Sequence, residues 1–585
     1  MFEDHTERVD LLSPIDVTFL DAEEGGPPLT IAAVMVVEGP PPSLDELTDM
    51  IARRVPEIPR LRQRVMPMPY DMVRPIWVEA EHFDVSDHVH FVPLPPPGRL
   101  SDLEETVGDL VTFPLRHDLP LWDAWLLDGL EGDRWALLVR MHHAAVDGVG
   151  GSMMMLRLFD SDPEGGAFWR EEPTETGHGT ADSPGATVDS GAPTEDRTAD
   201  AGGESAADTG RGAATAEGAP SDRPGEPGGR PGEPSAEVRA IAAAVDQQVR
   251  HVAGRLNSLL DSARHGDVTR RASETLRGLT AALTSAAAPS HSALSGPVGP
   301  GRRWVTAQVP LEDLRPIRRR FGGTVNDVAL TAVAGAIRHL LVERGERIAK
   351  GMVKVFVPVS QRTEVDSVGT NRISGMVAEL PIGDIDAVER LRQVAGHLGH
   401  LKSSGESAAL GALISAAAWA PTPLTRLGVR LGAPHVIGMI DTIATNVPGP
   451  PFPLFLGGRE ILAIYPYVPI REPLRMVVGI FSYNGSLYLG VTGDTASLPD
   501  LEAVPGAFVR TVGELVERSR RAVTRTGSTS ETSDSGETGD SGGATSSTGA
   551  AEPATSESGS LAAGTSQPGT AVGGTDIGSD SPLPQ

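Results

Sequence analysis

The chain has 585 residues, no cysteine and a formal net charge of −28 at pH 7. Its length predicts more than one folded domain, and the lack of cysteine excludes disulfides, thiolate metal ligands and cysteine nucleophiles. No segment shows the basic excess that nucleic-acid binding requires, so we expect no nucleic-acid partner.

Much of the negative charge lies in two segments of low complexity. Residues 171–235 carry −10 and residues 523–585 carry −7, and both are rich in Gly, Ser, Thr, Pro and Glu. Such segments cannot bury enough apolar surface to offset the entropy of ordering, so we predict that both are disordered.

These segments divide the chain into four predicted ranges: an N-terminal subdomain at 1–170, an acidic linker at 171–235, a helical connector with a C-terminal subdomain at 236–523, and a tail at 524–585. The charged start lacks the pattern of a signal peptide. The apolar runs are shorter than the roughly 18 residues of a membrane-spanning helix, so we expect a cytoplasmic protein that is soluble or peripheral.

Strands alternate with helices in the first subdomain, which predicts a mixed α/β fold. Ser43 is a favourable helix N-cap. The predicted elements are a strand at 29–39, a helix at 43–55, extended chain at 75–94, a helix at 100–115 and a strand pair at 120–130 and 133–143.

The second subdomain is also mixed, and Asn484-Gly485 is a strong hairpin signal. Residues 236–260 have the apolar spacing of an amphipathic helix, which either packs on the fold or touches lipid. The other predicted elements are a strand from 303, a helix at 322–345 opened by Thr324 and Asp327, strands at 352–362 and 368–383, a helix ending at 405, a strand within 441–458, a hairpin at 474–494 and a last helix ending at 523.

A histidine pair follows the predicted strand 133–143, in the stretch RMHHAAVDGVG from Arg140 to Gly150. Histidine has an unperturbed pKa of about 6.5, so it can accept and return a proton near neutral pH. A strand end would position His142 and His143 for such a role. We expect Asp147 to brace the loop and Gly148 to permit the turn into the next segment.

Other chemistries find less support. The spacing offers no third metal ligand near the histidine pair, so we predict no metal site. GDSGG at 539–543 looks like a serine-protease motif, but it lies in the low-complexity tail. The predicted folded ranges contain neither a GxSxG nucleophile turn nor a phosphate-binding loop.

HHAAVDG at 142–148 resembles the HHxxxDG signature of the chloramphenicol-acetyltransferase-like acyltransferases, which include peptide-synthetase condensation domains. Further motifs in order resemble the bacterial wax ester synthase/diacylglycerol acyltransferase family. Ser295 departs from that pattern, in which an asparagine precedes the glycine. The motifs are LSPIDVTFL at 12–20, PLW at 120–122, SGPVGPGRR at 295–303, TVNDVAL at 324–330, VPVSQR at 357–362, NRISGM at 371–376 and TNVPGP at 445–450.

The resemblance implies two chloramphenicol-acetyltransferase-like subdomains of mixed sheets, with the active site in a channel at their interface. It implies transfer of a long-chain acyl group from acyl-CoA to the hydroxyl of diacylglycerol or a fatty alcohol. His143 would be the general base and His142 a supporting residue, with no acyl-enzyme and no cofactor. Such an enzyme would work peripherally at the membrane or at lipid droplets.

The remaining motifs each allow a structural and a functional interpretation. Trp122 either packs the strand or lines an acyl tunnel. Asn326 and Asp327 either begin a helix or bind substrate, and Asn446 either belongs to a turn or binds substrate. Arg362 is the expected ion-pair partner of Asp147.

Two other functions stay open: a condensation-type acyltransferase that uses a carrier protein, and a non-catalytic protein of lipid-droplet surfaces. The PLW, ND and NVPGP motifs disfavour the first. The intact set of His142, His143 and Asp147 disfavours the second. The sequence does not distinguish diacylglycerol from a fatty alcohol as the acceptor.

Overall fold

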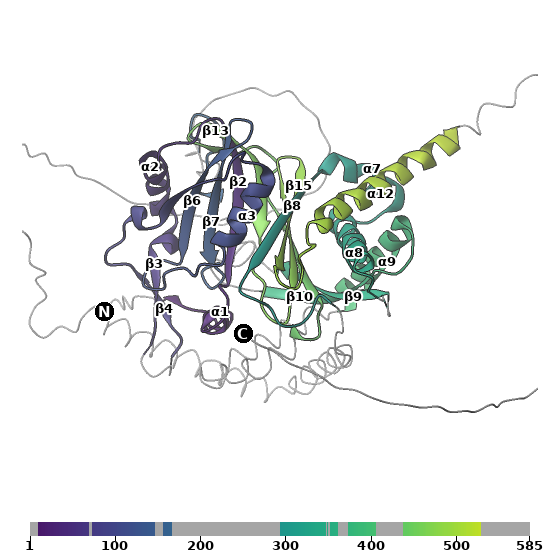
Figure 1. Cartoon of the computed structure of the whole chain (residues 1–585), viewed down its shortest axis with the longest axis horizontal. Helices are drawn as coiled ribbons and strands as arrows, with labels where there is room; N and C mark the ends of the chain where they lie inside the picture. Colours follow the sequence, from purple (N-terminus) through teal and green to yellow (C-terminus); the bar gives the residue numbers. More distant parts are fainter. Residues whose placement is uncertain are drawn as a thin grey trace, which may run out of the picture. The chain divides into compact units, whose positions relative to one another are not determined.

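The computed structural model describes residues 10–68, 73–146, 156–166, 293–346, 348, 351–360, 373–404 and 437–527. These residues form two six-stranded mixed sheets with associated helices, so the predicted α/β class with two sheet-based subdomains is confirmed (Figure 1). A small sheet of β1 (Asp10–Leu11), β4 (Ile76–Glu79) and β3 (Gln63–Met66) accompanies the first subdomain.

The first six-stranded sheet places the strand that ends at the histidine pair near its centre. The sheet order is β12-β13-β2-β7-β6-β5, and all neighbours pair antiparallel except β5 and β6. The predicted strand pair is confirmed as β6 and β7. The bounds are β2 (Thr30–Glu38), β5 (Val89–Pro93), β6 (Trp122–Leu130), β7 (Arg134–His142), β12 (Phe455–Leu456) and β13 (Arg459–Tyr467).

Two strands of this sheet come from the C-terminal half of the chain. β13 pairs with β2, with Tyr465 opposite Val34. β12 and β13 belong to the range 236–523, which we predicted as the helical connector and C-terminal subdomain, and they join the first sheet. Tyr483 lies on a strand of the second sheet, and its hydroxyl donates to the Ile461 carbonyl oxygen of β13 at 2.7 Å. This hydrogen bond joins β13 to the second sheet.

The second sheet has the order β10-β9-β11-β14-β15-β8, and helices cover it (Figure 1). Its core consists of apolar side chains from these strands and from the helices packed on them. The bounds are β8 (Arg302–Pro310), β9 (Met352–Ser360), β10 (Ile373–Pro381), β11 (Thr442–Pro448), β14 (Met476–Tyr483), β15 (Ser486–Asp494), α7 (Leu311–Phe321), α8 (Val325–Glu343), α9 (Ala387–Ser404) and α12 (Ala503–Gly527).

Helix α8 is apolar around most of its circumference because it lies inside this core. Within the described residues it is the one helix long and apolar enough to cross a membrane, but 72% of its most apolar window is buried in the protein. A core helix of a globular protein has the same composition. The predicted cap is present, because the Thr324 side chain accepts from the Asp327 amide and the Asp327 side chain accepts from the Thr324 amide.

Other local predictions are confirmed with small shifts at the element ends. Asn484 and Gly485 have φ of 40° and 78°, the positive values that a tight hairpin turn between β14 and β15 requires. Ser43 caps α2 (Leu44–Arg54), and α3 (Leu100–Leu110) ends five residues before its predicted end. Helix α12 continues to Gly527, past the predicted start of the tail at 524.

Helix α1 (Pro14–Glu23) precedes β2 and is the element that the functional site depends on most. Ser13 caps its first turn, with the side chain accepting from the Asp16 amide at 3.2 Å. Its last turn carries Glu23 and no basic residue. The linker 171–235, the amphipathic segment 236–260 and the tail beyond 527 lie outside the described residues.

Candidate active site

The histidine pair is held at the end of β7 by hydrogen bonds to both neighbouring strands. The His142 amide donates to the Leu121 carbonyl oxygen at 3.0 Å, and the His143 amide donates to the Leu29 carbonyl oxygen at 3.0 Å. Leu121 immediately precedes β6 and Leu29 immediately precedes β2. The backbone of the two histidines is therefore held by the chain next to β6 and by the chain next to β2, the two strands that flank β7.

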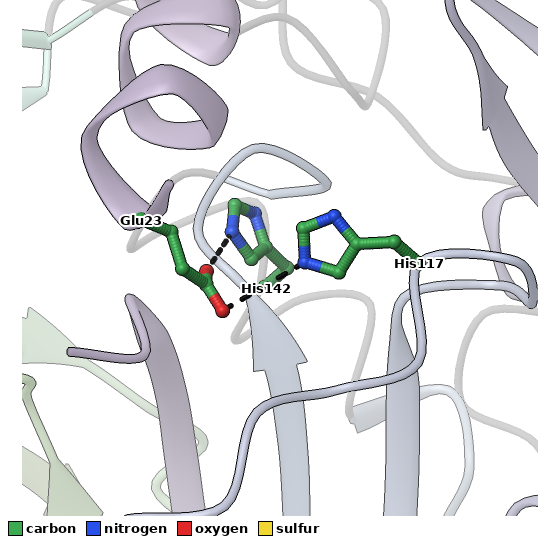
Figure 2. A group of neighbouring side chains, drawn as sticks. All are labelled: Glu23, His117 and His142. Carbon is green, nitrogen blue, oxygen red and sulfur yellow. Dashed lines mark hydrogen bonds and ion pairs between the residues drawn. The ribbon is translucent and has the colours of Figure 1, made fainter. Parts of the chain in front are cut away.

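His142 is buried, and its backbone surroundings fix its tautomer. Its Nδ1 accepts from the Ala144 amide at 3.0 Å, so the ring proton lies on Nε2. This Nε2 lies 2.5 Å from Oε2 of Glu23 and donates to it (Figure 2). His142 is consequently a neutral donor that ties the end of β7 to the last turn of α1.

Glu23 is a buried carboxylate that contacts a second histidine. Its Oε2 also accepts from the Leu29 amide at 3.3 Å, and its Oε1 lies 3.7 Å from Nε2 of His117 (Figure 2). Burial by itself raises the pKa of Glu23, but the contacts with His117 and His142 lower it to about 2. The same contact with Glu23 raises the pKa of His117. Glu23 is therefore ionised at neutral pH.

His143 stacks on an aromatic residue of the same helix. The rings of Phe19 and His143 are nearly parallel, with centroids 4.0 Å apart. Burial lowers the pKa of His143 to about 4, although part of the side chain is still exposed to solvent. The imidazole is thus neutral at pH 7, which is the state that a general base requires.

Helix α1 contacts both histidines through two residues one turn apart, Phe19 and Glu23. The C-terminal half of the chain contacts the end of this helix, because the Arg471 guanidinium donates to the Ala22 carbonyl oxygen. Arg471 lies in the segment between β13 and β14. The site is therefore built from both halves of the chain.

Glu23, His117 and His142 also form a group that could hold a metal ion, because one ligand atom from each lies within 4.8 Å of the others. Sequence spacing did not reveal this group, and the expectation that no third ligand is near the pair was wrong. A metal on His142 Nε2 requires the ring proton on Nδ1. The Ala144 amide donates to that atom, so the observed arrangement favours a proton over a metal at Nε2. That the protein binds no metal stays a prediction.

The geometry of Trp122 favours the packing interpretation. The residue is 2% exposed, and its indole nitrogen donates to the Leu61 carbonyl oxygen at 2.8 Å. Its ring stacks on His88, with centroids 4.5 Å apart and an interplanar angle of 6°. A tryptophan with both ring face and N–H engaged inside the core has a structural role.

The structure brings the ND and NVPGP motifs together. The Asn446 side-chain amide donates to Oδ1 of Asn326 at 3.0 Å, which joins β11 to the start of α8. Asp327 is buried and caps the same helix through Thr324. These contacts give Asn326, Asp327 and Asn446 structural roles, while their contact with substrate stays a prediction.

Three predicted residues, Asp147, Gly148 and Arg362, lie outside the described residues, so their predicted roles are not tested. Sequence reasoning missed Phe19, Glu23 and His117. One signal for Glu23 was present: a carboxylate in the last turn of a helix is unfavourable with the helix dipole, and such local conflicts concentrate at functional sites.

Two family domains match the chain. The wax ester synthase/diacylglycerol acyltransferase catalytic domain matches residues 12–191 and 198–329, and the C-terminal domain of the same family matches residues 369–515. A probable diacylglycerol O-acyltransferase of Mycobacterium tuberculosis, tgs1, is 31% identical over 518 residues, which are 88% of this chain and 97% of that protein. A putative diacylglycerol O-acyltransferase of the same species is 26% identical over 528 residues, covering 87% and 90%.

Solved structures share the fold. The wax ester synthase/diacylglycerol acyltransferase from Marinobacter aquaeolei VT8 has a TM-score of 0.55 at 20% identity, covering 87% of this chain and 100% of that one. The first condensation domain of the calcium-dependent antibiotic synthetase has a TM-score of 0.52 at 13% identity, covering 87% and 97%. By its sequence and its domains, this chain belongs to the wax ester synthase/diacylglycerol acyltransferase family and is an acyltransferase of that family.

Proposed function

We propose that this protein transfers a long-chain acyl group from acyl-CoA to a lipid hydroxyl. Diacylglycerol is the leading acceptor, giving triacylglycerol, and a long-chain fatty alcohol is the second, giving a wax ester. The observation that carries the proposal is the neutral His143 imidazole, fixed at the end of β7 and on Phe19. The relatives named as diacylglycerol O-acyltransferases support the choice of acceptor.

In the proposed reaction, His143 accepts the proton of the acceptor hydroxyl while that oxygen attacks the thioester carbonyl carbon. A carbon–oxygen bond forms, and the carbon–sulfur bond then breaks. The departing CoA thiolate takes the proton from His143, which returns to its neutral state. Proton transfer by a positioned side chain contributes roughly 10²–10⁴ in rate. No acyl-enzyme is needed, in keeping with a chain that has no cysteine.

His142 and Glu23 support this base without touching the reacting atoms. The hydrogen bond between them fixes the His142 ring and the chain that enters His143.

We also propose that the protein works peripherally at the cytoplasmic face of the membrane or on lipid droplets, because both acceptors are lipids that partition out of water. Flotation of the purified protein with diacylglycerol-containing vesicles tests this. Protein that stays at the bottom of the gradient while the vesicles float, at physiological ionic strength, contradicts it.

The test of function uses purified protein, palmitoyl-CoA and a panel of acceptors: dioleoylglycerol, hexadecanol and glycerol. We expect ester formation and stoichiometric release of CoA with dioleoylglycerol, hexadecanol or both. A donor attached to a carrier protein serves as the alternative substrate. Transfer only from the carrier-bound donor, or to no hydroxyl acceptor, contradicts the proposal.

A further inference from the structure

We propose that the His117 imidazolium is a positioning residue that holds the Glu23 carboxylate against His142, and that it makes acyl transfer depend on pH through a group outside the HHxxxDG motif. The inference rests on the proposed function for its activity readout. It goes beyond that function because it assigns a role to a residue of the segment between α3 and β6.

The charge of Glu23 is largely shielded from water and needs a partner inside the protein. The carboxylate side chain is 7% exposed, and His142 offers it a neutral N–H. Among the described residues, the histidines that contact the Glu23 carboxylate are His117 and His142. Because the His142 ring is neutral, His117 supplies the compensating charge. A buried carboxylate without a cationic partner is strongly disfavoured, so this contact decides how well Glu23 is held in place.

His117 is the member of the group that solvent reaches most easily. The His117 side chain is 50% exposed, whereas the His142 side chain is fully buried. His117 therefore exchanges protons with the solution. The His117 and His142 rings meet edge to face with centroids 5.7 Å apart, so all three members of the group are in direct contact (Figure 2). A change of protonation at His117 reaches the histidine pair through a single carboxylate.

The direction of the pH dependence follows from the groups around His117. Glu23 and Asp118 favour its protonated form and partial burial opposes it, while the Arg116 guanidinium is paired with Asp118. The net effect raises the pKa of His117 above its ordinary value of 6.5. Glu23 is already ionised above its lowered pKa of about 2, so the ion pair is present in the folded protein from acid pH up to the raised pKa of His117. It is lost as the pH rises through the raised pKa of His117.

Four variants of the full chain separate this role from a merely structural one. His117→Arg keeps the positive charge at every pH, and His117→Gln removes it. His339→Arg and His339→Gln are the controls, because Nε2 of His339 on α8 also lies near a glutamate, 3.1 Å from Glu343, and contacts the Arg510 guanidinium but no residue of the site. The measurement is kcat/KM for acyl transfer between pH 5 and 10.

We expect the wild-type kcat/KM to fall on the alkaline side as His117 loses its proton. His117→Arg should retain its pH 6 value into the alkaline range. His117→Gln should stay near the low alkaline value of the wild type across the range, roughly tenfold or more below the wild type at pH 6, which is the scale of a small misplacement of a catalytic group. Both His339 variants should follow the wild-type profile. Profiles of His117→Arg and His117→Gln that match the wild type contradict the proposal.

A second measurement does not depend on activity. Exchange of the histidine C2 hydrogen, followed by mass spectrometry, gives the pKa of His117 in the wild type and in Glu23→Gln. We expect a value above 6.5 in the wild type that falls toward 6.5 in the variant. An identical titration in both proteins shows that the pair does not form and overturns the inference. A wild type that acylates no acceptor contradicts the proposed function instead.

Discussion

His142 and Glu23 are 119 positions apart in the sequence, yet Nε2 of His142 lies 2.5 Å from Oε2 of Glu23. The Ala144 amide on the other ring nitrogen makes His142 the donor in this contact. His142, the first histidine of the motif, therefore has a structural role: its hydrogen bond to Glu23 fixes the end of β7. The second, His143, is left as the proton acceptor.

Replacing Glu23 tests this division of roles. Glu23→Ala leaves the buried His142 N–H without its acceptor, which should reduce the free energy of unfolding by about 1–3 kcal/mol. Glu23→Gln retains a carbonyl oxygen for that N–H and should lose less. Urea unfolding at pH 7 measures both. If Glu23→Ala is as stable as Glu23→Gln, the hydrogen bond does not support the fold.

Replacing Phe19 tests what keeps His143 neutral. Burial is the main cause of its low pKa, and Phe19 covers one face of the ring. Phe19→Ala should raise the pKa of His143 from about 4 toward 6.5, because water then stabilises the imidazolium. The base is active only when neutral, so the acid limb of kcat/KM should move to higher pH. Phe19→Leu keeps an apolar cover and should shift less.

The pH–rate profile of Phe19→Ala and Phe19→Leu between pH 4 and 8 checks this prediction. An acid limb at the same pH in the wild type and in Phe19→Ala would mean that Phe19 does not shield the base.

Replacing Trp122 distinguishes packing from a place in an acyl tunnel. Trp122→Ala removes a buried indole and should cost about 3–5 kcal/mol of unfolding free energy. Trp122→Phe keeps a ring over His88 but loses the hydrogen bond to Leu61, which is worth about 1 kcal/mol. We expect the preference for acyl chain length to be unchanged in Trp122→Phe. A changed preference with unchanged stability would place Trp122 in the tunnel instead.

Local sequence patterns predicted well those turns and helix caps that depend on interactions between neighbouring residues. The Asn484-Gly485 turn, the Ser43 cap and the Thr324–Asp327 cap each depend on residues a few positions apart, and each is present. The strand that ends at His142 was evident from its apolar run. The family motifs, not the periodicity, carried the assignment of chemistry to His143.

Contacts between distant parts of the chain could not be predicted from the sequence, because no local pattern encodes them. β13 joins the first sheet through pairing with β2, more than 400 positions away, and its own pattern is that of any buried strand. His117 lies in a segment with no regular pattern, and its contact with Glu23 depends on the last turn of α1 meeting the end of β7. Only the unfavourable position of Glu23 at the end of α1 hinted at a functional contact.

The most direct test of the central claim is the rate of acyl transfer by His143→Ala, with palmitoyl-CoA and the better acceptor at saturating concentrations. We expect kcat to fall by roughly 10²–10⁴, with the urea midpoint close to that of the wild type and the binding of palmitoyl-CoA retained. His142→Ala should instead lose stability, because it leaves Glu23 buried without its donor. A His143→Ala variant that keeps the wild-type kcat would contradict the assignment of His143 as the base.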